Sequence, residues 1–296
     1  MSTLPPSVRL ETGRGGLPVL RVSALAATAE IYLHGAHVTS WVPMGQQPVV
    51  WLSAASRFDA DSAIRGGVPI CFPWFGARAG HPEGPQHGFA RLSHWELVDT
   101  RDQGDEVVVQ LRLTDSEATR ATDWPYRFAA TFTVVVGAQL SMTLEVMNRD
   151  TTEFTFEEAL HTYLAVGDVR ATEVSGLEGT PYVDRPTGPD PVPGEPGTVR
   201  FTDLTDRIYL ATAARTTVRD VAGGRSIGIS KDGSDSTVVW NPWVDNARAM
   251  ADFGDDEWTG MICVETCNVR DDSVLLEPDQ SHSMTARLEV SALSTP

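Results

Sequence analysis

The amino-acid sequence predicts an all-β protein folded as a large antiparallel β-sandwich. Short runs that alternate apolar and polar residues, or that are rich in β-branched residues, recur along the chain, and Gly, Asp, Asn or Pro separates them. Helical periodicity is scarce, which excludes the alternating strand and helix units of a parallel sheet. No repeat of fixed period occurs, so a β-propeller is not favoured.

The expected elements follow one another with ordinary strand lengths. In the first half, strands are predicted at residues 18–22, 31–33, 38–42, 106–113, 128–136, 140–147 and 154–164. In the second half, they are predicted at residues 207–211, 216–221, 226–230, 237–240, 261–267, 273–276 and 284–290. Helix is expected only at residues 54–59 and 246–252. A sandwich of this size can be one unit, so residues 1–296 are expected to form a single domain.

A segment rich in proline and glycine, residues 176–200, interrupts the strand pattern. Its six prolines are too frequent for a central strand, because proline cannot donate a hydrogen bond to a sheet. We expect a long surface connection within the domain. It is either a plain insertion that joins two halves of the sandwich or a loop that walls the active site.

Charge and cysteine content limit the partners and the compartment. The 23 Lys and Arg residues against 40 Asp and Glu residues give a net charge of −17, which repels nucleic acids and anionic membranes. Three cysteines cannot all pair within one chain, and the N-terminus lacks the pattern of a signal peptide. No apolar stretch approaches the roughly 20 residues that cross a bilayer. We expect a cytoplasmic monomer that binds neither nucleic acid nor membrane.

Motifs for cofactors are missing from the sequence. It contains neither a phosphate-binding GxxxxGK[ST] loop nor a GxGxxG turn after a strand. Cys263 and Cys267 lie four residues apart on one expected strand, about 13 Å at 3.3 Å per residue, too far to share one zinc ion. No metal and no cofactor are therefore expected.

Glu265 occupies an unusual position in the predicted strand 261–267. Strand alternation places it on one face between Cys263 and Cys267, while the opposite face is apolar. Two apolar faces indicate a central strand, where an ionised carboxylate must be paired or functional. Both interpretations remain open at this point.

His161 falls inside the predicted strand 154–164. Alternation places Glu157, Ala159 and Tyr163 on the same face as this histidine. By itself, the position is compatible with a core histidine whose hydrogen bonds are satisfied or with a functional group.

Two loops carry polar and aromatic clusters. Residues 64–76 combine an arginine, a glycine pair and several aromatic residues, and residues 84–91 combine amide, imidazole and guanidinium groups. Glycines allow a close approach of the backbone to a ligand, and aromatic rings form walls on which sugars stack. Tight turns with exposed arginines are the alternative. The candidate binding residues in these loops are Arg65, Gln86, His87 and Arg91.

Five motifs in order, RGGVPICFPWFG, GPQHGFAR, EALHTYLAV, TDRIYL and CVETCN, resemble the aldose 1-epimerase (mutarotase) superfamily. They are most similar to its hexose-6-phosphate mutarotase branch, and the resemblance spans about Ile31 to Leu288. It implies an antiparallel β-sandwich of the galactose mutarotase type. It also implies that His161 is the general acid and Glu265 the general base. The residues implied to contact the substrate are Arg65, Gln86, His87, Arg91 and Asp206.

The implied reaction interconverts the α and β anomers of a hexose 6-phosphate, with glucose 6-phosphate as the expected substrate. Opening the ring needs an acid and a base in concert, without a metal or redox cofactor. Ordinary pKa values of about 6.5 for His and 4.3 for Glu allow one protonated and one ionised partner after modest tuning. We expect Glu157 or Asp206 to keep His161 protonated. Arg65 and Arg91 are the expected phosphate ligands.

Three other functions remain as alternatives. A non-catalytic carbohydrate-binding sandwich would use the same aromatic residues and loops. A glycoside hydrolase would use Glu265 and Asp206 as its two carboxylates. A mutarotase for free aldoses such as galactose or glucose would need no phosphate ligand.

Overall fold

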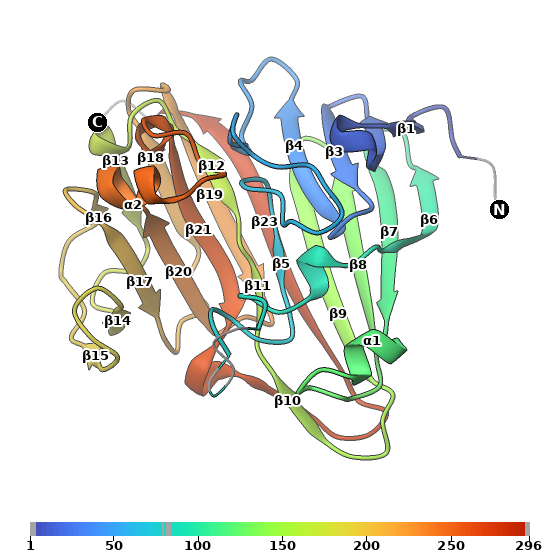
Figure 1. Ribbon diagram of the computed structural model, residues 1–296. Helices are drawn as coiled ribbons and strands as arrows, with labels where there is room; N and C mark the ends of the chain where they lie inside the picture. Colours follow the sequence, from blue (N-terminus) through green and yellow to red (C-terminus); the bar gives the residue numbers. More distant parts are fainter. Residues whose placement is uncertain (1–3, 79, 81–83, 294–296) are drawn as a thin grey trace.

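Four antiparallel sheets make up the computed structural model, which describes residues 4–78, 80 and 84–293 (Figure 1). Every pairing between the strands of these sheets is antiparallel, which confirms the predicted all-β, antiparallel architecture. The largest sheet has nine strands. In spatial order these are β16 (Val199–Arg200), β13 (Thr172–Ser175), β18 (Thr216–Asp220), β19 (Arg225–Asp232), β23 (Ser281–Ala292), β9 (Leu140–Asn148), β8 (Phe128–Val136), β7 (Val107–Thr114) and β6 (Glu96–Asp102).

An eight-stranded sheet carries most of the residues singled out in the sequence. In order, it contains β15 (Pro191–Val192), β14 (Tyr182–Asp184), β17 (Thr205–Tyr209), β20 (Ser236–Asn241), β21 (Met261–Asn268), β11 (Glu158–Leu160) and β5 (Ile70–Cys71), and β12 (Tyr163–Ala165) also pairs with β21. The four-stranded sheet contains β1 (Val8–Thr12), β2 (Pro18–Ser23), β3 (Ala27–Tyr32) and β4 (His37–Pro43). A small sheet joins β10 (Phe154–Phe156) to β22 (Val274–Leu276).

Helices are few and short in the described part of the chain. The α-helices are α1 (Glu117–Arg120) and α2 (Trp243–Ala249). The 3₁₀ turns are η1 (Arg14–Gly16), η2 (Ala90–Leu92), η3 (Val169–Ala171), η4 (Glu257–Gly260) and η5 (Arg270–Asp272). Among the described residues, none of these helices has the length and hydropathy that a membrane crossing requires.

The main core lies between the sheets and results from strict alternation. In β8 and β9 every second residue is buried, because successive side chains point to opposite faces of a strand. Residues of the nine-stranded, eight-stranded and four-stranded sheets join one apolar cluster, which includes Phe132, Ile262 and Trp41. The Trp41 indole N–H donates a hydrogen bond to the Gly137 carbonyl at 3.2 Å and so connects β4 to the turn between β8 and β9.

A second, smaller apolar cluster lies beside β21 and gives this strand two buried faces. Its members come from six strands of the eight-stranded sheet and include Cys71, Ala159, Val183, Ile208, Val238 and Cys267. All residues of β21 are buried, which confirms the predicted central strand. The strand on which Glu265 lies is therefore held rigidly from both sides.

The two expected helices need correction. Residues 54–59 form no helix: a turn at 54–55 is followed by irregular backbone and a bend at residue 59. The Glu257 carboxylate accepts hydrogen bonds from the Ser53 hydroxyl at 2.7 Å and from the Ala54 N–H at 2.9 Å, and these bonds fix a non-helical path. The helix expected at 246–252 is instead α2, which begins earlier, at the residue after a proline.

Candidate active site

His161 lies in the connection between β11 and β12, and this position corrects the single strand expected at residues 154–164. The His161 N–H donates to the Pro69 carbonyl at 3.0 Å, and the Thr162 N–H donates to the Leu160 carbonyl at 2.8 Å. These bonds separate β11 from β12, and a break at Glu157, whose N–H donates to the Pro73 carbonyl at 2.9 Å, separates β10 from β11. The resulting turn directs the imidazole of His161 toward β21.

Glu265 faces this imidazole from the middle of β21. The His161 Nε2 atom and the Glu265 Oε1 atom are 3.3 Å apart. Glu265 is 1% exposed, and neither of its carboxyl oxygens accepts a hydrogen bond from the described residues. The His161 Nδ1 atom is also buried without a partner among them. Buried polar atoms normally have partners, so these atoms are candidates for contact with a ligand.

Burial controls the protonation of this pair. It lowers the pKa of His161 to about 3, and the positive charges of Arg91 and Arg65 add to the lowering. Burial also raises the pKa of Glu265 well above its usual value, and the negative charge of Asp206 adds to the raising. The protein by itself therefore favours a neutral imidazole, whereas the sequence predicted a protonated histidine.

Glu157 does not support the charge of His161 as expected. Its carboxylate accepts hydrogen bonds from the Phe75 N–H at 2.8 Å and from the Arg270 N–H at 2.7 Å. The break in the strand separates Glu157 from the face that His161 uses. Glu157 instead connects two loops that border the site.

Aromatic rings surround the imidazole. The ring of Tyr163 stacks on His161 with centroids 4.9 Å apart, and Trp240 meets it edge-on at 6.2 Å. Phe75 stacks at 6.5 Å and His87 lies edge-on at 5.5 Å. These contacts hold the plane of His161 in one orientation, which a proton donor requires.

Arg65 is fixed beside the pair by two partners. Its Nε donates to the Asp252 carboxylate at 3.2 Å, and its Nη1 donates to the Tyr163 hydroxyl at 3.2 Å. The two glycines after Arg65, Gly66 and Gly67, allow close packing against neighbouring protein atoms rather than contact with a ligand. A Cβ on Gly67 would lie 2.4 Å from the Nε2 atom of His37.

The polar side chains of the loop at residues 84–91 differ in their burial. The Arg91 guanidinium donates from Nη2 to the Gln86 carbonyl at 2.8 Å, and its Nε is buried without a partner among the described residues. His87 is half-buried and accepts a hydrogen bond from the Gly76 N–H at its Nδ1 atom, so a neutral His87 carries its proton on Nε2. The side chain of Gln86 is exposed.

Asp206 lies on β17, and the proline-rich segment reaches it. Arg185, which follows β14 in that segment, places its Nη1 3.4 Å from the Asp206 carboxylate, and its N–H donates to the Asp206 carbonyl at 3.0 Å. Both charges act on Glu265: Asp206 raises its pKa and Arg185 lowers it. The structure thus favours the loop that walls the site over the plain insertion.

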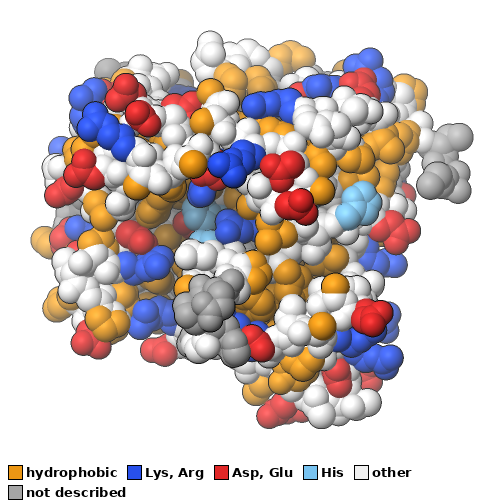
Figure 2. Space-filling model, in the orientation of Figure 1, with side chains coloured by type: hydrophobic (Ala, Val, Ile, Leu, Met, Phe, Trp, Pro, Cys, Tyr) orange, Lys and Arg blue, Asp and Glu red, His pale blue; other side chains and the backbone are white. Residues whose placement is uncertain are grey.

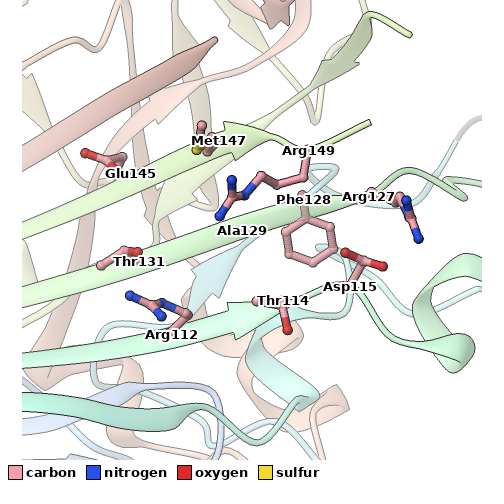
Figure 3. Close-up of a pocket in the computed structure, with 10 residues that line it drawn as sticks. All are labelled: Arg112, Thr114, Asp115, Arg127, Phe128, Ala129, Thr131, Glu145, Met147 and Arg149. Carbon is pink, nitrogen blue, oxygen red and sulfur yellow. The ribbon is translucent and has the colours of Figure 1, made fainter. Parts of the chain in front are cut away.

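A hollow of about 370 Å³ opens at the arginines, lined by Arg65, Gln86, Arg91 and Asp252 among others. The space-filling view shows histidine atoms at the bottom of a depression, with Lys or Arg atoms beside them (Figure 2). Another hollow, of about 460 Å³, lies on the outer face of β7, β8 and β9 and includes Arg112 and Arg149 (Figure 3). None of the predicted site residues lines this second hollow, whereas Arg65, Gln86 and Arg91 line the first, so the second hollow is not the candidate active site.

Three site residues were missed in the sequence. Tyr163 and Asp252 position Arg65, and Arg185 positions Asp206. Tyr163 was recognisable, because it lies two residues after His161. Asp252 and Arg185 reach the site through tertiary contacts, for which the sequence offers no local signal.

Comparisons with known proteins agree with this fold. The sequence model of the family described as aldose 1-epimerase matches residues 19–289. A relative from Escherichia coli (strain K12), named "Putative glucose-6-phosphate 1-epimerase", is 35% identical over 255 residues, which cover 86% of this chain and 84% of the relative. A relative of the same name from Cenchrus ciliaris is 33% identical over 280 residues, 92% of this chain and 84% of the relative.

Solved structures show the same architecture. A Salmonella typhimurium protein described as a "putative mutarotase (YeaD)" has a TM-score of 0.91 at 32% identity, with coverage of 99% of this chain and 96% of that one. A galactose mutarotase-like protein from Clostridium acetobutylicum, at 13% identity, has a TM-score of 0.73 over 96% of this chain and 98% of its own and shares the fold.

The fold and the matches define the class of protein: an isomerase built on an all-β sandwich of the galactose mutarotase type. The chain belongs to the aldose 1-epimerase family, which the match over residues 19–289 and the relatives above 30% identity establish. The resemblance of the five sequence motifs is confirmed at this level.

Proposed function

We propose that the protein interconverts the α and β anomers of a hexose 6-phosphate, with glucose 6-phosphate as the substrate. The observation that carries the proposal is the buried pair of His161 and Glu265, 3.3 Å apart with unpartnered polar atoms, next to two guanidinium groups. The names of the E. coli and Cenchrus ciliaris relatives support the choice of substrate.

In the proposed reaction, Glu265 removes the proton of the C1 hydroxyl while His161 protonates the ring oxygen. The bond between C1 and the ring oxygen breaks, and the open aldehyde forms. Rotation about the C1–C2 bond and the reverse steps give the other anomer. One acid and one base suffice, and each contributes roughly 10² to 10⁴ in rate.

Substrate binding would change the charge around the imidazole. Arg91 and Arg65 lower the pKa of His161 when nothing offsets their positive charge. A phosphate group bound to these guanidinium groups cancels that charge and so raises the pKa of His161. This change shifts the pKa of His161 toward the protonated form that the role of general acid requires.

The other polar residues would fix the sugar. We propose that Gln86, His87 and Asp206 contact its hydroxyl groups, with Asp206 held by Arg185. The ring of Trp240, next to His161, offers an apolar wall. We also propose a monomer of one domain in a reducing, cytoplasmic setting, which three unpaired buried cysteines support. Size-exclusion chromatography and cell fractionation test these two points.

Magnetisation-exchange NMR on equilibrated glucose 6-phosphate tests the function. The protein should accelerate α-to-β exchange, and His161→Asn and Glu265→Gln should each reduce the acceleration by about 10² or more. Circular dichroism and thermal unfolding establish that each variant is folded. Full activity in folded variants would remove these residues from the mechanism. Preference for free glucose or galactose would indicate a mutarotase for free aldoses, and no acceleration with any sugar would indicate a binding protein.

A further inference from the structure

A third potential metal ligand lies next to the histidine–glutamate pair. Cys263 precedes Glu265 by two residues on β21, so both side chains lie on the same face of the strand. One ligand atom each of His161, Cys263 and Glu265, a nitrogen, a sulfur and a carboxylate oxygen, lie within 4.8 Å of one another. All three side chains are buried, and the oxygens of Glu265 accept no hydrogen bond from the described residues.

This set of donors matches the preferences of zinc. Zinc in proteins binds histidine nitrogen at about 2.0–2.1 Å, carboxylate oxygen at about 2.0–2.2 Å and thiolate sulfur at about 2.3 Å, in tetrahedral geometry. In a tetrahedron with these bond lengths, the nitrogen and oxygen ligands are about 3.4 Å apart. The His161 Nε2 and Glu265 Oε1 atoms already have this spacing, at 3.3 Å. The sulfur of Cys263 needs to move closer by at most about 1.2 Å to occupy the third corner of the tetrahedron.

We propose that His161, Cys263 and Glu265 form a zinc-binding site inside the reaction centre, and that zinc inhibits the enzyme by occupying its acid and base. The inhibition rests on the proposed function, but the binding does not. The fourth position remains for water or a substrate oxygen. Zinc is an inhibitor in this proposal and takes no part in the isomerisation.

Charge and proton balance agree with such a site. The imidazole binds through a neutral nitrogen, the thiol of Cys263 releases its proton as the zinc–sulfur bond forms, and Glu265 binds as a carboxylate. The two resulting negative charges offset the double positive charge of the metal. This offset is required because Arg65 and Arg91 place positive charge nearby.

Cys267 provides a matched control. It is a buried cysteine on the same strand and the same face, two residues beyond Glu265, and it is not part of the ligand group found among the described residues. Removal of Cys263 should therefore weaken zinc binding, and removal of Cys267 should not. Cys263→Ser preserves the size of the side chain and serves as a second variant if Cys263→Ala folds poorly.

The test measures binding directly and activity separately. The full-length protein is titrated with Co²⁺, followed by the thiolate-to-metal absorption band, and with Zn²⁺ by calorimetry in buffers of different ionisation enthalpy. We expect one zinc per chain, proton release, displacement of cobalt by zinc, and a loss of affinity of about 100-fold or more in Cys263→Ala but not in Cys267→Ala. Equal affinity in the wild type and in Cys263→Ala would overturn the site.

Activity separates the two proposals. Zinc should abolish anomer exchange in the wild type and in Cys267→Ala at a concentration that leaves Cys263→Ala active. Zinc binding that leaves exchange unchanged would overturn the inhibition. Zinc binding at Cys263 in a protein that accelerates no exchange would support the metal site and contradict the proposed function.

Discussion

Arg91→Met is the substitution that most directly tests recognition of the phosphate. The guanidinium of Arg91 has one structural hydrogen bond, from Nη2 to the Gln86 carbonyl, and a buried Nε without a partner among the described residues. No carboxylate forms an ion pair with it in the part of the chain that the structure describes. Methionine retains the unbranched stem and removes only the charge and the donors.

The expected magnitude follows from the hydrogen bonds to phosphate that the substitution removes. One hydrogen bond to a charged group contributes about 1.5–3 kcal/mol. This range corresponds to a reduction of about 10- to 150-fold in kcat/KM for glucose 6-phosphate. Free glucose has no phosphate, so its kcat/KM should change by a few-fold at most.

Exchange NMR at several concentrations of each sugar measures kcat/KM for glucose 6-phosphate and for glucose. Arg149→Met, on the outer sheet face shown in Figure 3, is the matched control and should leave both substrates unaffected. An equal loss with glucose and glucose 6-phosphate would refute phosphate binding by Arg91. A loss in the Arg149 variant would show that the effect comes from overall charge.

Three further results are expected. Arg185→Met should raise KM for glucose 6-phosphate less than Arg91→Met does. The Arg185 side chain is 45% exposed, and exposed ion pairs such as the one with Asp206 contribute about 0–1 kcal/mol. Equal increases in KM, measured by exchange NMR, would contradict this prediction. Gly67→Ala should lower the free energy of unfolding in urea by about 2–4 kcal/mol, because the φ of Gly67 is +68° and the new Cβ would contact His37. Gly45 has a similar φ of +75°, but no atom lies within reach of its new Cβ, so Gly45→Ala should lower the free energy of unfolding by less. A similar loss in both variants would exclude the steric reason. His282→Gln should destabilise the protein most below about pH 6.5, since the hydrogen bond to Glu158 raises the pKa of His282 and this stabilisation disappears as pH rises through the raised value. A destabilisation that grows toward alkaline pH, in urea unfolding at several pH values, would have the wrong sign.

Long strands with one face on the core were predictable, whereas edge strands such as β1 and short strands such as β13 were not. β8 and β9 alternate strictly because one face packs on the core. β1 and β6 lie at sheet edges, where most of their residues are exposed or half-buried, and neither was predicted. The helix expected at 54–59 does not form, because the Ser53 hydroxyl and the Ala54 N–H donate hydrogen bonds to Glu257, which is distant in sequence.

The site was predictable where local pattern and family motif agree. Alternation placed Glu265 on a doubly buried strand, and the structure shows this strand. The turn at His161 depends on a hydrogen bond to Pro69, and the protonation of the pair depends on burial and on arginines from other loops. Such effects arise only when distant segments meet, and therefore the neutral state of His161 could not be predicted from the sequence.

The hydrogen bonds of the segment that carries Arg65 fix the distance between this arginine and the imidazole of His161. The Gly67 carbonyl accepts the N–H of Tyr163, and the Pro69 carbonyl accepts the N–H of His161, each at 3.0 Å. Arg65, the proposed phosphate ligand, and His161 therefore lie on two segments that backbone hydrogen bonds join, and these bonds fix the spacing between the two residues. If the proposed function holds, we expect a sugar whose phosphate is one carbon nearer to the reacting centre, or one further away, to be a poor substrate because of its length and not its charge.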